Sequence, residues 1–323
     1  MINLGILLTR QYRLLSVAAI LDVFQTVNKL SASNGAAPHF NITLLRAGDA
    51  VTQASDALIN DQIKDIRDVE KQNLILIPAF STEEVQNAIM ENRDYIPWLT
   101  EQFKTGTHLA SFCTGAFLLG ATGLLNGRPA TTHIDACGAF AAAFPTVNLM
   151  PYQVVTSDNG IYTSGGSTSS FHLMLHIIKK YCGSEMAIRT AKIFAIDMDR
   201  SQQAYFGTFL PSQDHHDELV AMAQQKIEAA YRDSATIEEM IKDVPASRRN
   251  MVRRFKQVTG CTPIEYLQKL RVEGAKKLLE QTNQQMTEVM LNSGYNDPKA
   301  FRKIFKKTVG MTPTGYREKF QVN

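Results

Sequence analysis

The sequence has 323 residues and a formal net charge of +3, with 44% hydrophobic and 20% charged residues. This composition is typical of a globular protein and excludes a disordered or collagen-like chain. Because 323 residues exceed what one hydrophobic core usually organises, two domains are expected.

The N-terminal stretch MINLGILLTRQYR places its basic residues after a short apolar run, whereas a signal peptide places them before it. No stretch is expected to approach the roughly 20 apolar residues of a membrane span. The cysteines are widely scattered and form no CxxC pair, which argues against a disulfide framework or a cysteine zinc site: Cys113, Cys137, Cys182 and Cys261. We therefore expect a cytoplasmic chain with reduced thiols, without a membrane segment, a metal site or a cofactor.

Short apolar runs alternate with amphipathic stretches through the first part of the chain. The runs lie at 2–8, 40–47, 73–80 and 107–112, and helical patterns lie between them at 17–30 and 83–90. This alternation predicts a parallel sheet with helices on both faces. A hairpin is expected around 158–160, followed by a helix over 167–181.

The stretch SFCTGAFLLGATGLL at 111–125 places Cys113 between the last of these strands and a helical run. Small residues, Ser111 and Gly115, stand two positions to either side, as in the cysteine form of a nucleophile elbow. The N-terminus of the following helix is expected to lower the pKa of the thiol. A reactive cysteine is therefore chemically possible at this turn.

After Pro211 the strand signals end, and the chain is predicted to be helical to its last residues. An internal repeat lies within this region: FKQVTGCTPIEY at 255–266 and FKKTVGMTPTGY at 305–316. In each copy a glycine is suited to end one helix, and a Thr-Pro pair is suited to begin the next. The repeat therefore predicts a duplicated helical unit.

A further helix and a turn precede each copy, so the region is predicted to contain two helix-turn-helix units. Helical phasing turns Met251 and Phe255 inward in the first unit, and Phe301 and Phe305 inward in the second. The opposite faces carry the candidate DNA-binding residues: Arg248, Arg249, Asn250, Arg253, Lys299, Ala300 and Lys303. From Thr236 onward there are 17 Lys and Arg against 9 Asp and Glu, a charge of +8 that leaves −5 for the rest. Duplication and charge together favour double-stranded DNA as the partner over a merely solvated basic face.

Residues 213–323 resemble the AraC/XylS-type DNA-binding domain. The pattern of its tail matches Gly294-Tyr295, the pair Phe301 and Phe305, Gly310 with Pro313, and Tyr316-Arg317. Residues 1–195 resemble the ThiJ/PfpI, or class I glutamine amidotransferase-like, domain through the elbow and the ATTHID segment. With 196–212 as a linker, the whole chain resembles the GlxA-type regulators, including GLLNGRPATTH at 123–133 and RSQQAYF at 200–206.

This resemblance implies an α/β fold, a flavodoxin-like parallel sheet with helices on both faces, followed by an all-α domain with two helix-turn-helix units. It also implies a dimeric transcription regulator whose first domain senses an unknown small-molecule effector. Cys113, Thr114 and His133 are the residues expected to bind that effector. The operator, the effector and the sign of regulation are left open.

The alternative is a cysteine-dependent amidohydrolase or deglycase of the ThiJ/PfpI type. Such enzymes need a base near the thiol and N–H donors for the oxyanion. Here Thr114 follows the cysteine where protease-like relatives carry His, Ser16 falls where a Glu is usual, and Ala79-Phe80 replaces a glycine pair. Cys113 and His133 are therefore expected to be vestigial or sensing residues, and the protein is not expected to be an enzyme. His172 and His176, although spaced i, i+4, lack an evident third metal ligand.

Overall fold

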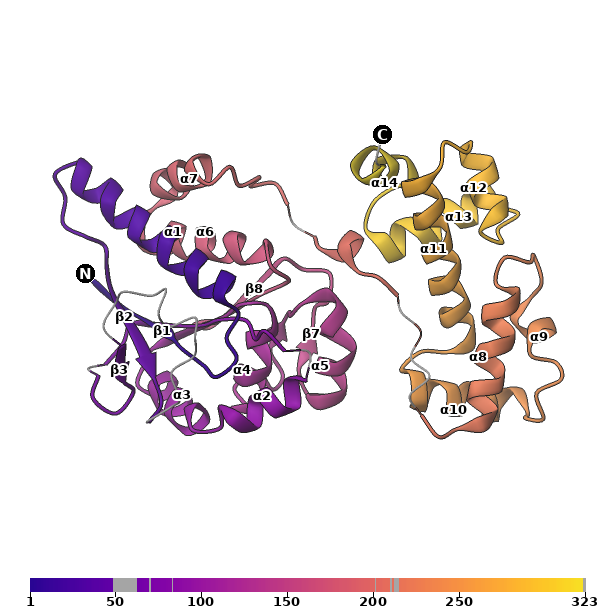
Figure 1. Ribbon diagram of the computed structural model, residues 1–323, viewed down its shortest axis with the longest axis horizontal. Helices are drawn as coiled ribbons and strands as arrows, with labels where there is room; N and C mark the ends of the chain where they lie inside the picture. The colour runs from indigo at the N-terminus through magenta and orange to yellow at the C-terminus, as the bar shows by residue number, and fades with distance from the viewer. Residues whose placement is uncertain are drawn as a thin grey trace. The chain divides into compact units, whose positions relative to one another are not determined.

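The computed structural model describes residues 1–48, 63–69, 71–82, 84–200, 202–209, 211 and 215–321. The chain divides into two compact units, Met1–Gln203 (unit 1) and Ala204–Asn323 (unit 2), coloured in sequence order in Figure 1. This division falls within the segment 196–212 that the sequence assigns to a linker. Each unit contains two clusters of buried apolar side chains of its own.

Unit 1 is built on a seven-stranded sheet in the order β3-β2-β1-β4-β5-β9-β8. Its strands are β1 (Ile2–Leu7), β2 (Phe40–Arg46), β3 (Ile63–Asp65), β4 (Leu74–Ile77), β5 (His108–Ser111), β8 (Val155–Asp158) and β9 (Ile161–Ser164). Neighbouring strands run parallel except β8 and β9, which form the predicted antiparallel hairpin. The central run β2-β1-β4-β5-β9 has the flavodoxin-like order, so the predicted fold class is confirmed.

Helices cover both faces of this sheet (Figure 1). One face carries α1 (Leu14–Ser33), α6 (Ser169–Cys182) and α7 (Ser184–Ile193). The other carries α2 (Val85–Glu91), α3 (Tyr95–Lys104), α4 (Ala116–Ala121) and α5 (Cys137–Ala143). Alternate strand residues supply the two cores, so Leu4 and Ile6 pack with the first set of helices and Leu7 with the second. The sequence patterns did not reveal β3, α3, α5 or α7.

Helix α1 is long and apolar enough, by length and composition, to cross a bilayer. The expectation that no stretch approaches a membrane span was therefore wrong for Leu14–Ser33. Eight of its residues are buried, and Val17, Phe24 and Val27 pack against the sheet. This burial identifies α1 as a core helix of unit 1.

Unit 2 contains seven α-helices in its described residues, after a 3₁₀ turn at Ala204–Phe206. They are α8 (Glu218–Ala230), α9 (Ile237–Met240), α10 (Arg248–Thr259), α11 (Pro263–Gln281), α12 (Met286–Asn292), α13 (Pro298–Val309) and α14 (Pro313–Phe320). One core joins α8, α9 and α10 to the start of α11, and the other joins the rest of α11 to α12, α13 and α14. Helix α11 thus connects two helical halves, as Figure 1 shows.

The turn that follows α10 and α13 has the same geometry in both copies of the repeat. Gly260 and Gly310 end these helices in the left-handed region, with φ of 74° and 84°. Thr262 and Thr312 then cap α11 and α14 by accepting a backbone N–H in the first turn, and a proline follows each threonine. The predicted duplication is therefore present in the backbone as well as in the sequence.

Candidate functional site

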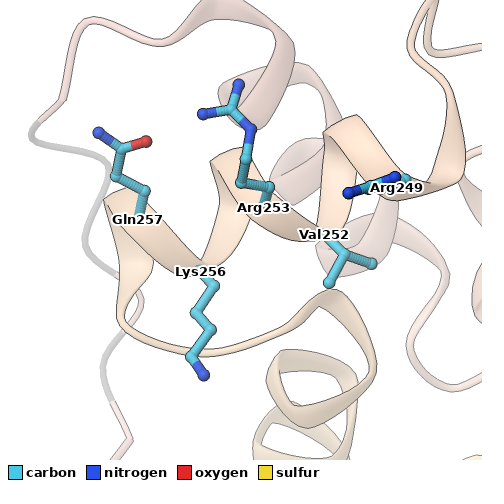
Figure 2. A pocket seen from close by; sticks show the side chains of 5 residues that line it. All are labelled: Arg249, Val252, Arg253, Lys256 and Gln257. Carbon is cyan, nitrogen blue, oxygen red and sulfur yellow. The ribbon is translucent and has the colours of Figure 1, made fainter.

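Helix α10 presents a basic face to solvent. Ser247 caps its N-terminus, and Met251 and Phe255 are buried in the first core of unit 2, so the opposite side of the helix is free. Figure 2 shows the side chains on that side, which line an open hollow of about 580 Å³: Arg249, Val252, Arg253, Lys256 and Gln257. Arg249 and Arg253 are exposed, as the helical phasing predicts.

Two other predicted contact residues lie beside this face. Asn250 is half-buried, and its Oδ1 accepts a hydrogen bond of 3.2 Å from Nη2 of Arg253, which restrains that guanidinium. Arg248 forms an ion pair of 2.9 Å with Glu238, and its side chain is 82% exposed. An exposed pair of this kind is worth little, so Arg248 can exchange its carboxylate for a phosphate at small cost.

Helix α13 repeats the arrangement. Phe301 and Phe305 are buried, Lys299 and Lys303 are exposed, and Ala300 is half-buried. The Asp297 carboxylate caps the helix by accepting the N–H groups of Lys299 and Ala300. The structure thus distributes the predicted DNA-binding residues over two equivalent helices, within or beside their exposed faces.

The exposed faces extend beyond the residues that the sequence singled out. Continuing the helical phase by one turn adds further exposed residues: Val252, Lys256, Gln257, Arg302, Lys306 and Lys307. The two faces differ in chemistry, because α10 carries arginines and a glutamine whereas α13 is dominated by lysines. The planar fork of arginine suits bidentate contacts to a base, whereas the lysine ammonium is a point charge.

In unit 1, Cys113 lies at the predicted sharp turn. Its φ is +53°, unusual for a residue other than glycine, and a 3₁₀ turn at Cys113–Gly115 joins β5 to α4. A Cβ atom at Gly115 would lie 2.4 Å from the carbonyl oxygen of Pro78, so only glycine fits there. The backbone therefore has the strained form of a nucleophile elbow.

The environment of the thiol opposes ionisation. Cys113 is 4% exposed, and burial raises its pKa above the ordinary value. The backbone N–H groups of Thr114 and Ser167 and the charge of Arg13 offset this effect only in part. The N–H group of Thr114 lowers the pKa of the thiol, as the sequence predicts for the start of a helix, but desolvation is the larger effect and the net shift is upward.

The raised pKa of Cys113 predicts slow alkylation of its thiol at neutral pH. The thiolate is the reactive form, so the rate of modification by iodoacetamide is expected to be low at pH 7 and to rise at a higher pH than for an exposed cysteine peptide. Mass spectrometry of the Cys113 peptide from about pH 6 to about pH 10, a range that covers the titration of ordinary and raised thiols, measures this rate. A midpoint below that of the free peptide would contradict the assignment.

The loop that supplies oxyanion donors in enzymes of this type has both of its N–H groups engaged. Ala79 donates to Oγ of Ser16 at 3.1 Å, and Phe80 donates to Oγ1 of Thr114 at 2.9 Å. Ser16 and Thr114, like Ala79-Phe80 itself, are departures from the enzyme pattern. These side chains therefore occupy the donors that an oxyanion would need.

His133 is not arranged as a base for Cys113. Its Nδ1 accepts the backbone N–H of Asp135 at 3.3 Å, and in the described part of the chain no hydrogen bond joins its ring to Cys113. The ring instead lies against Gly166, where a Cβ would approach its Cδ2 to 2.6 Å. The link to the elbow comes from Thr132, whose Oγ1 donates to the carbonyl oxygen of Cys113 at 3.0 Å.

The helical histidines do not converge. The ring nitrogens of His172 lie 3.3 and 2.9 Å from the carbonyl oxygens of Thr168 and Asp197, and the ring of His176 packs against that of Tyr162. Among the residues that the structure describes, no three His, Cys, Asp or Glu side chains are grouped as metal ligands.

Comparison with known families matches both units. Residues 25–180 match the DJ-1/PfpI family, and residues 240–319 match a family described as a helix-turn-helix domain. The chain is similar to the HTH-type transcriptional regulator GbdR of Pseudomonas aeruginosa, with 27% identity over 98% of this chain and 84% of that protein. It is also similar to the HTH-type transcriptional regulator GlxA of Rhizobium meliloti, with 24% identity over 98% of this chain and 96% of that protein.

Among solved structures, a protein from Vibrio parahaemolyticus aligns with 59% of this chain and 98% of its own length, with a TM-score of 0.50 and 18% identity. At this identity the likeness concerns the fold alone.

Proposed function

We propose that this chain, which joins a DJ-1/PfpI domain to an AraC-type helix-turn-helix domain, is a sequence-specific DNA-binding regulator of transcription that works in the cytoplasm. The observation that carries this proposal is the pair of equivalent helices, α10 and α13, each with an exposed basic face. Its relatives GbdR and GlxA, which match nearly end to end, are named as transcriptional regulators.

The geometry supports base readout because an α-helix fits the major groove of B-DNA. In helix-turn-helix proteins the N-terminal part of the second helix meets the base edges. Arg249 and Arg253 lie in the first half of α10, and Lys299 and Lys303 lie in the first half of α13. The lysines at the far ends of both helices, Lys256 and Lys306, add charge toward the phosphates.

Selection of binding sites from random duplex DNA by the full chain, at a stated salt concentration, tests this function. We expect the selected pool to converge on a motif with two parts, one for each helix. A pool with no sequence preference in a competition assay would refute the proposal.

We further propose that unit 1 senses a small-molecule effector at Cys113, Thr114 and His133 and does not hydrolyse it. Support comes from the buried thiol with a raised pKa and from the engaged N–H groups of Ala79 and Phe80. The elbow also lies at the carboxyl ends of the parallel strands, where α/β proteins bind ligands.

The alternative hydrolase or deglycase function is tested with panels of amides, esters and glycated amines. Turnover by the wild-type protein is expected not to exceed that of Cys113→Ala, because the groups that would activate the thiol and stabilise an oxyanion are otherwise engaged. Cys113-dependent turnover above roughly 1 per second, an ordinary enzyme rate, would establish the enzyme instead.

Unit 1 is also the proposed dimerisation module, since two linked DNA-binding units gain affinity through effective concentration. We expect the full chain and the fragment of residues 1–203 to sediment as dimers at micromolar concentration. A monomeric full chain under these conditions would contradict the proposed dimer. A dimeric full chain with a monomeric fragment would mean that unit 2 forms the dimer contact.

A further inference from the structure

Gln203, the last residue of unit 1, has a buried side-chain amide that forms hydrogen bonds with several loops near the elbow. It is 1% exposed. Its Oε1 accepts the backbone N–H of Gly166 at 3.0 Å, and its Nε2 lies 3.0 Å from the carbonyl oxygens of both Thr132 and Pro151 and 3.2 Å from Oγ1 of Thr131. One amide thus satisfies polar groups from three separate loops.

Two of these loops form the surroundings of Cys113. Thr132, which gives its carbonyl oxygen to Gln203, donates its own Oγ1 to the carbonyl oxygen of Cys113. Gly166, which gives its N–H to Gln203, is followed by Ser167, whose N–H faces the Cys113 thiol. Gln203 is therefore joined to Cys113 through a single residue on one side and through two adjacent residues on the other.

The loop at Gly165 packs tightly against the Gln203 amide. A Cβ at Gly165 would lie 1.9 Å from Oε1 of Gln203, so any residue other than glycine there would displace the amide or the loop. Arg200, three residues earlier, contacts the end of the same loop. Its guanidinium donates to Oγ1 of Thr168 at 2.7 Å and to Oγ of Ser169 at 3.0 Å.

The chain enters unit 2 directly after Gln203. Ala204 is buried, and Tyr205 packs against the second core of unit 2, with its ring 6.1 Å from that of Phe320. Only one residue separates the amide that braces the elbow loops from the aromatic ring that belongs to the helical unit. The residue that braces the elbow loops is therefore adjacent in sequence to the first residues of unit 2.

We propose that Gln203 is the positioning residue of the Cys113 site and the point at which the state of that site is passed to the DNA-binding unit. The positioning role concerns unit 1 alone. The transmission to the DNA-binding unit rests on the proposed function. By thermodynamic linkage, if the state of the Cys113 site changes the affinity for DNA, then bound DNA must shift the equilibrium between the states of that site by the same factor.

Alkylation of Cys113 by iodoacetamide in the full chain, followed by peptide mass spectrometry, tests the positioning role without a known effector. Gln203→Ala removes the brace, and Gly165→Ala displaces it. Both variants are expected to raise the alkylation rate of Cys113 about tenfold, the factor that corresponds to one buried hydrogen bond. Gln202→Ala is the matched control, because Gln202 is the exposed neighbour, and its rate is expected to stay at the wild-type value.

Two internal checks separate positioning from general unfolding. The alkylation rate of Cys182, on α6, should be the same in all variants, since that cysteine lies outside the braced loops. Gln203→Glu supplies the second check, because an ionised carboxylate would face two carbonyl oxygens. Burial among acceptors raises the pKa of such a carboxyl, and its protonated form can again donate. This variant is therefore expected to approach the wild-type rate at acid pH and to depart from it as the pH rises.

The same measurement with a selected DNA duplex tests the coupling. DNA is expected to change the Cys113 alkylation rate in the wild-type protein and in Gln202→Ala, but not in Gln203→Ala. Wild-type rates of Cys113 in both Gln203→Ala and Gly165→Ala would overturn the positioning role. A DNA effect that is absent from the wild type, or that persists in Gln203→Ala, would overturn the coupling. Failure to select any DNA would refute the proposed function and leave the positioning result standing.

Discussion

Arg253→Ala is expected to weaken binding of the full chain to its selected DNA about tenfold to hundredfold, since a bidentate contact to a base is worth roughly 1 to 3 kcal/mol. Arg253 is exposed on the face opposite the buried Met251 and Phe255, and Asn250 restrains its guanidinium. The substitution should also relax the base preference at one or two positions under α10. Anisotropy titrations at fixed salt and a repeated selection with the variant measure both effects.

Two control variants define what the result means. Arg93→Ala removes an exposed arginine from unit 1 and should leave DNA affinity unchanged. Lys303 occupies the position of Arg253 in the second copy, and Lys303→Ala is expected to relax the base preference in the other part of the selected motif while leaving the part under α10 unchanged. If Arg253→Ala lowered the affinity for all DNA sequences equally and left the selected motif unchanged, base readout by α10 would be contradicted.

Phe255→Ala is expected to cost about 3 to 5 kcal/mol in the free energy of unfolding of unit 2. The Phe255 side chain is fully buried, and its ring meets that of Tyr266 edge-on at 5.2 Å between centroids. Removal leaves a cavity where α10, α8 and α11 meet. Thermal unfolding of the full chain should show a lower transition for unit 2 and an unchanged transition for unit 1.

The neighbouring Lys256→Ala is the matched control, because Lys256 is exposed on the same helix and should change stability by less than about 0.5 kcal/mol. Phe305→Ala repeats the experiment at the equivalent position in the second core and should cost a similar amount. A Phe255→Ala variant as stable as Lys256→Ala would mean that the first core does not depend on this ring.

The sequence predicted the positions of the central strands along the chain and the two helix-turn-helix units because these signals are local, whereas the flavodoxin-like order of the strands was implied only by the family resemblance. Alternation of apolar runs, a glycine at a helix end and a Thr-Pro pair at the next helix start act within a few residues of one another. The spacing from Phe255 to Tyr266 is repeated from Phe305 to Tyr316, so the helix boundaries predicted in one copy were supported by those predicted in the other. The short strand β3 and the helices α3, α5 and α7 were missed because their sequence patterns are weak, and tertiary packing determines them.

The sharp turn at Cys113 and the exposed basic faces of α10 and α13 could be predicted from the sequence, since steric rules and helical phasing fix both. The surroundings of the thiol, in contrast, depend on contacts between distant parts of the chain. Ser16 reaches Ala79 across 63 residues, and Gln203 reaches Thr131 across 72. Hydrogen bonds over such separations depend on how the strands and loops assemble, and no local pattern encodes them. Desolvation of the thiol has the same origin, because burial is a property of the packed domain rather than of any segment.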